Sequence, residues 1–131
     1  MLARRAMGST TSFRDLEVWQ LSMQLVEDVY KVTRLMPREE FDLRRQIRRA
    51  AVSIPVNVAE GWRRRSRLAY RNHVSIALGS QAELETEFEI AARINALPVD
   101  VYADVLSRAG SVGRMLTRLH QRLSEEVVGR G

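Results

Sequence analysis

Arginine is the residue type in this sequence whose spacing points most directly to a chemistry. Nine arginines and one acid, Glu60, lie between residues 44 and 71. A guanidinium group donates two parallel hydrogen bonds to phosphate or carboxylate, which the ammonium group of lysine cannot do. We therefore predict that this segment binds nucleic acid, with RNA as the favoured ligand. The predicted contact residues are Arg44, Arg45, Arg48, Arg49, Arg63, Arg64, Arg65, Arg67 and Arg71.

Other interpretations of the arginine-rich segment stay open. Of the 21 basic residues only Lys31 is a lysine, and a high genomic G+C content produces the same bias. A run of charge is also often a solvated face with weak ion pairs. Trp62 and Tyr70 lie among the arginines and are suited to stacking on bases. Trp62 is equally suited to packing against the first helix or a neighbouring subunit.

Charge is distributed unevenly along the chain, whose formal net charge is +5. Six acids and one arginine, Arg93, lie between residues 81 and 104, downstream of the basic segment. Such asymmetry indicates a nucleic-acid or acidic protein partner. It also permits self-assembly in which the basic face of one subunit meets the acidic face of the next. The alternative function is therefore a protein-interaction scaffold, whose basic face docks a partner or a neighbouring subunit.

The sequence gives no positive support for catalysis or for a cofactor. It contains no cysteine, so a disulfide, a thiolate metal site and a cysteine nucleophile are excluded. The two histidines, His73 and His120, lack the spacing of a zinc-binding helix. The Glu-x-x-His pattern of di-iron bundles is also missing. We expect a non-catalytic protein without metal or cofactor, and a solvated or subunit-facing stripe at Glu83, Glu85, Glu87 and Glu89.

Length and composition indicate one soluble domain. The chain has 131 residues, of which 45% are hydrophobic and 28% are charged, as is typical of globular proteins. No apolar run approaches the roughly 18 residues of a membrane span, and the first residues lack the apolar core of a signal peptide. We therefore expect a cytoplasmic protein with a disordered N-terminal arm over residues 1–12.

Apolar residues recur at helical spacing in four segments, over about residues 14–35, 37–61, 67–95 and 99–123. A seven-residue repeat typical of helical bundles marks the third segment, at Tyr70, Val74, Ala77, Gln81, Leu84, Phe88 and Ala91. The fourth repeats this spacing at Tyr102, Val105, Ala109, Val112, Leu116, Leu119 and Leu123. Because the connections are short, we predict an all-α, up-down-up-down four-helix bundle over residues 13–123 and a frayed tail over residues 124–131.

Several residues within these segments are unusual for helix interiors. Pro55 removes one backbone hydrogen bond, so we predict a kink in the turn before it. Ser53 and Asn57 lie four residues apart and are placed to satisfy the freed backbone groups. Gly61 either ends this helix or admits a neighbouring helix closely. A close helix crossing is the simplest explanation for Gly79, because glycine weakens a helix interior.

Three motifs resemble those of a known family. They are FRDLEVWQ at residues 13–20, QIRRAAVSIPVNVAEG at 46–61 and GSQAELE at 79–85. The sequence resembles the four-helix-bundle proteins encoded in 23S rRNA intervening sequences, which implies a bundle that assembles into a homopentameric ring. It is more distantly similar to the accessory protein of diversity-generating retroelements, a basic pentameric bundle. That similarity implies nucleic acid and a reverse transcriptase as partners.

Overall fold

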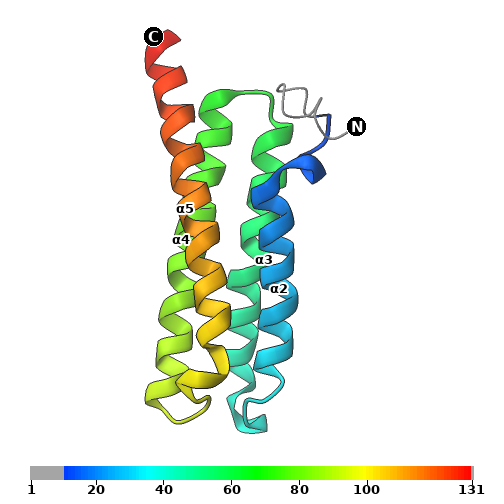
Figure 1. Cartoon of the computed structure of the whole chain (residues 1–131), viewed down its shortest axis with the longest axis vertical. Helices are drawn as coiled ribbons and strands as arrows, with labels where there is room; N and C mark the ends of the chain where they lie inside the picture. The colour runs from blue at the N-terminus through cyan, green and yellow to red at the C-terminus, as the bar shows by residue number, and fades with distance from the viewer. Residues whose placement is uncertain (1–10, 131) are drawn as a thin grey trace.

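Four long helices make up the described part of the protein, residues 11–130, and each runs antiparallel to the next (Figure 1). The structure is a computed structural model. Two short 3-10 helices precede α2 and α3. The elements are η1 (Phe13–Asp15), α2 (Glu17–Thr33), η2 (Arg38–Glu40), α3 (Phe41–Arg63), α4 (Arg67–Arg93) and α5 (Val99–Arg130). The predicted all-α bundle is thus confirmed, while the predicted arm over residues 1–12 lies almost wholly outside the described residues.

The interior of the bundle is built from the apolar repeats. All seven repeat positions of α5 are buried, and so are five of the seven in α4. The other two, Tyr70 and Gln81, are half-buried. Phe88 of α4 stacks on Tyr102 of α5 with ring centroids 5.0 Å apart. Removal of these side chains from water is the main force that holds the helices together.

The turns between helices are short and have specific backbone conformations. Ser66 caps α4, because its hydroxyl accepts a hydrogen bond from the Ala69 amide at 3.2 Å. Arg65 in the α3–α4 turn and Asn95 in the α4–α5 turn have left-handed φ angles of 57° and 61°. Each turn reverses the chain within a few residues, which places the end of one helix beside the start of the next.

Pro55 lies within α3, which continues from Phe41 to Arg63. Pro55 leaves the carbonyl of Ala51 without its usual hydrogen-bond donor. Ser53 and Asn57 make other bonds instead, so the prediction that they satisfy this carbonyl is wrong. The Asn57 amide donates to the Ser53 carbonyl at 2.9 Å and to the Ser53 hydroxyl at 3.0 Å. Asn57 Oδ1 accepts from His73 Nδ1 at 3.0 Å, and the Ser53 hydroxyl accepts from Ser80 at 2.7 Å. These bonds join α3 to α4 in a polar network.

The two glycines singled out in the sequence have opposite surroundings. A Cβ atom on Gly61 would lie 2.8 Å from His73 Cβ and 2.9 Å from Tyr70 Cδ1, so this glycine does admit α4 closely. A Cβ atom on Gly79 would meet nothing within 4 Å. The predicted close crossing at Gly79 is therefore wrong within this chain, because the residue lies on the exposed side of α4.

The last helix is longer than the sequence predicted. It continues to Arg130 rather than ending near Leu123, and its end projects past the α3–α4 turn in Figure 1. Leu123 is still buried. The final turns of α5 therefore extend the helix beyond Leu123, the last buried residue that the structure describes.

Candidate nucleic-acid interface

The nine predicted contact arginines form two groups at opposite ends of the bundle. Arg44, Arg45, Arg48 and Arg49 lie in the first turns of α3, and the other five lie around the α3–α4 turn. At 1.5 Å of rise per residue, Arg44 and Arg63 are separated along α3 by about 28 Å. The single arginine face predicted from the sequence is thus two separate groups, which we call the α3-start cluster and the turn cluster.

Within the α3-start cluster, Arg48 joins two helices rather than facing solvent freely. Its Nε donates to the Thr33 hydroxyl at 2.8 Å, and its guanidinium lies 4.4 Å from the centre of the Tyr30 ring. Burial lowers the pKa of Arg48; Tyr30 opposes this effect, and the nearby Arg44 and Arg34 lower the pKa further. Arg48 is therefore a link between α2 and α3 and a poor candidate for contacting phosphate.

Acidic residues of α4 lie beside the α3-start cluster. Antiparallel packing places Glu83 and Glu87 in the same hollow of about 330 Å³ as Arg49. Burial raises the pKa of Glu87, and the nearby Glu83 raises it further. Arg45 lies 4.0 Å from Asp42. These carboxyl groups offset the positive charge of the cluster, so the α3-start cluster is the weaker candidate for binding a polyanion.

The turn cluster consists of Arg63, Arg64, Arg65, Arg67 and Arg71. Two of these have partners within the chain: Arg63 lies 5.4 Å from the centre of the Phe13 ring, and Arg67 forms an ion pair with Glu126. The other three form no ion pair with any residue that the structure describes. Arg64 and Arg65 are exposed and Arg71 is half-buried, so the guanidinium groups of Arg64 and Arg65 are open to solvent and to an anionic ligand.

Two further arginines lie at the same end of the bundle and were missed in the sequence. Arg118 and Arg122 of α5 line a hollow of about 470 Å³ together with Tyr70 of α4, and the acids Glu17 and Glu125 line it as well. Arg122 also influences the ionisation of Tyr70. The signal was present, because Arg114, Arg118 and Arg122 recur at i,i+4 spacing. We call Arg118, Arg122 and the turn cluster together the basic end.

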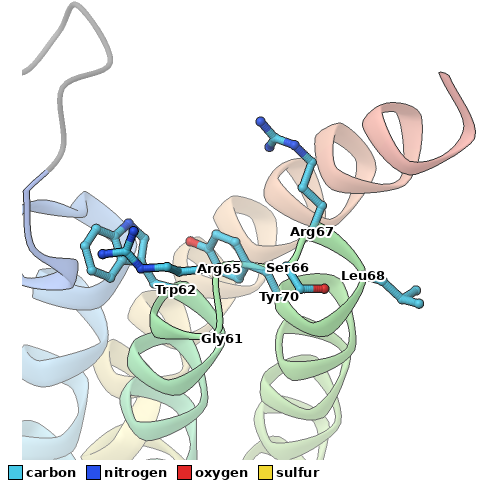
Figure 2. Close-up of a pocket in the computed structure, with 7 residues that line it drawn as sticks. All are labelled: Gly61, Trp62, Arg65, Ser66, Arg67, Leu68 and Tyr70. Atoms are coloured by element: carbon cyan, nitrogen blue, oxygen red, sulfur yellow. The ribbon is translucent and has the colours of Figure 1, made fainter. Parts of the chain in front are cut away.

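A hollow of about 660 Å³ opens at the α3–α4 turn (Figure 2). It is lined by Gly61, Trp62, Arg65, Ser66, Arg67, Leu68 and Tyr70. Burial raises the pKa of Tyr70 to about 12, with a smaller opposing effect of Arg122. The phenol therefore stays protonated at neutral pH and can donate a hydrogen bond. Arg67 and Leu68 point outward from the start of α4 in Figure 2.

Trp62 has the environment of a partly covered ring. It is half-buried, and Phe13 contacts it edge-on with ring centroids 6.4 Å apart at 75°. Packing against η1 agrees with one of the two interpretations made from the sequence. The same side chain lines the hollow at the turn, so packing on Phe13 and exposure to a ligand are compatible.

Comparison with known proteins identifies the family. The model of the 23S rRNA-intervening sequence protein family matches residues 14–118. The chain belongs to this family. A crystal structure of a protein with unknown function from the S23 ribosomal protein family of Bacteroides thetaiotaomicron has the same fold, with a TM-score of 0.73 and 22% sequence identity. The match covers 79% of this chain and 97% of that protein. No curated protein matches the chain.

Neither the family's description nor that of the solved neighbour names a reaction. Among the described residues, no three His, Asp or Glu side chains are grouped so that they could hold a metal ion. Within the same residues, every helix is too short or too polar to cross a membrane. The basic end is the candidate interface that the geometry of the described residues provides.

Proposed function

We propose that the protein is a non-catalytic, oligomeric four-helix bundle that binds nucleic acid, with RNA as the favoured ligand, through its basic end. One observation carries this proposal. Arginines from three chain segments meet at the α3–α4 turn and the adjoining part of α5, where several lack ion-pair partners among the described residues. The α4 glutamates that neighbour Arg49 lie toward the other end of the bundle. A cytoplasmic location belongs to the same proposal.

Contacts of this kind determine how binding should behave. Guanidinium groups that meet phosphates release counterions, so affinity falls steeply as salt rises and depends little on sequence. On a single strand each phosphate contact contributes about 0.7 to the slope of log affinity against log salt. Oligomerisation would present several basic ends to one strand and raise the overall affinity.

The test compares two triple variants that remove equal charge. One replaces Arg64, Arg65 and Arg71 by Ser, and its control replaces Arg44, Arg45 and Arg49 by Ser. Arg48 is kept in both because it links α2 and α3. The affinity for a labelled RNA is measured between about 50 and 300 mM salt. The first triple should lower the slope by about 2, and the control should change it much less. Failure of the parent protein to bind at low salt, or equal losses in both triples, would refute the proposal.

Exposed apolar residues favour a second candidate function, a scaffold that docks protein. Val52 and Val56 of α3 and Ile76 of α4 are 37%, 45% and 52% exposed, on two helices that pack against each other. A second copy of the chain is the simplest partner for these residues. Under this candidate function the protein assembles into a homopentameric ring or docks a reverse transcriptase. Val56→Asp with Ile76→Asp should split the oligomer in light scattering, whereas Leu35→Asp, at a 66% exposed site, should not. A parent protein that is monomeric would exclude self-assembly.

A further inference from the structure

Arg65 occupies a backbone conformation that suits glycine. Its φ angle is 57°, and it directly follows Arg64, the C-cap of α3. Glycine is the usual residue at this position after a helix, because its lack of a Cβ atom makes the left-handed conformation easy. The other left-handed residue, Asn95, is of a type that tolerates this conformation well. Arginine has no such tolerance, so a role of its side chain would explain its presence.

Arg65 lines two hollows at the α3–α4 turn. It lines the hollow of about 660 Å³ at the α3–α4 turn and an adjacent one of about 510 Å³, together with Trp62 in both cases. Volumes of this size lie within the range of small-ligand sites. Arg65 makes no ion pair with the described residues, so its charge is available to an anion beside the rings.

The aromatic residues supply flat faces at the same place. The ring of Tyr70 lies against Gly61, where a Cβ atom would approach it to 2.9 Å, and Trp62 is held by the edge contact with Phe13. Figure 2 shows Tyr70 between the end of α3 and the start of α4, and Trp62 on the other side of the end of α3, where the Arg65 side chain extends beside it. Aromatic rings beside arginines are the usual means by which proteins bind unpaired bases.

We propose that the hollow lined by Trp62, Arg65 and Tyr70 receives one unstacked nucleotide of a single strand. The base lies against an aromatic ring, and Arg65 binds the adjoining phosphate. This inference rests on the proposed function, since it specifies which nucleic acid the basic end prefers. A duplex keeps its bases stacked and paired, so it offers phosphates to the arginines but no base to the hollow.

The test measures two probes with one set of variants. The probes are a single-stranded RNA of about 12 nucleotides and a blunt duplex of the same sequence, both labelled for anisotropy. Arg65→Gly removes the side chain and relieves the backbone, so it should raise the urea midpoint of unfolding. It should also lower single-strand affinity about tenfold, with a smaller loss for the duplex.

Two matched controls separate charge from backbone. Arg64→Ser removes the same charge from the neighbouring residue and should weaken both probes by similar factors. Asn95→Gly changes the other left-handed residue and should leave both affinities unchanged. In a Trp19→Phe protein, Trp62 is the sole tryptophan, and its fluorescence should be quenched by the single strand and not by the duplex.

The outcomes distinguish this inference from the proposed function. If both probes bind with equal affinity and Arg65→Gly weakens them no more than Arg64→Ser, the hollow does not receive a base, although the basic end still binds phosphate. If the duplex quenches Trp62 as strongly as the single strand, the same conclusion follows. If neither probe binds, both proposals are wrong. The anisotropy measurements decide the matter even where Trp19→Phe disturbs folding.

Discussion

Two glycines in long helices should respond to the same substitution with opposite signs. Gly61 lies in α3 and Gly79 in α4, and replacement of either by alanine adds one methyl group. A Cβ atom at residue 61 would lie 2.8 Å from His73 Cβ and 3.3 Å from the Tyr70 carbonyl oxygen. A Cβ atom at residue 79 would have open space around it. The surroundings alone therefore decide the outcome.

The magnitude follows from two terms. Alanine is better than glycine in a helix interior by about 1 kcal/mol, so Gly79→Ala should stabilise the protein by about that amount. Gly61→Ala gains the same term, but the new methyl group overlaps atoms fixed to the backbone of α4. Overpacking of this kind costs about 1–3 kcal/mol. Since His73 Cβ cannot rotate away, we expect the upper part of that range and a net destabilisation of about 2 kcal/mol.

Urea unfolding followed by circular dichroism measures both changes, with each variant compared with the parent at two or more matched protein concentrations. The midpoint should rise for Gly79→Ala and fall for Gly61→Ala, with unchanged slopes. If Gly61→Ala is neutral, α3 and α4 separate more easily than their contact at Gly61 implies. If Gly79→Ala is destabilising and the loss grows with protein concentration, Gly79 contacts a second copy of the chain.

Two further predictions concern side chains between helices. Arg48→Ala should lower the free energy of unfolding by about 1–2 kcal/mol, because the hydrogen bond to Thr33 and the contact with Tyr30 are lost. Arg49→Ala is the control and should change the free energy of unfolding little in the same urea assay. Equal losses in the two variants would contradict the role of Arg48 as a link between α2 and α3. Burial raises the pKa of Glu87 above its ordinary value of 4.5, so its contribution to stability is present below that pH and is lost as pH rises through the raised pKa. Glu87→Gln should therefore raise the urea midpoint near neutral pH, with a gain that shrinks as the pH falls through the raised pKa toward 4.5. A gain that is independent of pH would show that the charge is not its cause.

The helices were predictable because burial imposes a periodic pattern on the sequence. Every apolar repeat position assigned to the fourth helix is buried in α5. The end of that helix was not predictable in the same way. Glycines at residues 129 and 131 and the charged residues 125 and 126 favour fraying at the chain end, although the backbone remains helical to Arg130.

The arrangement of the site was only partly predictable, since helical spacing assigns a residue to a face but does not say what that face meets. Arg48 and Arg49 are adjacent in the sequence, yet Arg48 contacts α2 while Arg49 lines a hollow shared with α4. The contribution of Arg118 depends on antiparallel packing, which brings α5 to Tyr70 from about 50 residues away along the chain. Gly79 was misinterpreted for the same reason. Glycine destabilises a helix interior, which suggested a close helix contact at this residue, but this chain makes no such contact.

The charge arrangement bears on how the two proposed activities fit together. Antiparallel packing puts Glu83 and Glu87 of α4 beside the α3-start cluster, so arginines without neighbouring α4 glutamates remain at the basic end. The exposed apolar residues Val52, Val56 and Ile76 lie within α3 and α4. Association through those helices would leave the basic end open. In a closed ring with cyclic symmetry, all basic ends would point to the same side, so one strand could contact several subunits. Dihedral assembly would direct them to opposite sides and forfeit that avidity. The proposed nucleic-acid binding and self-assembly therefore reinforce each other only if the assembly is cyclic.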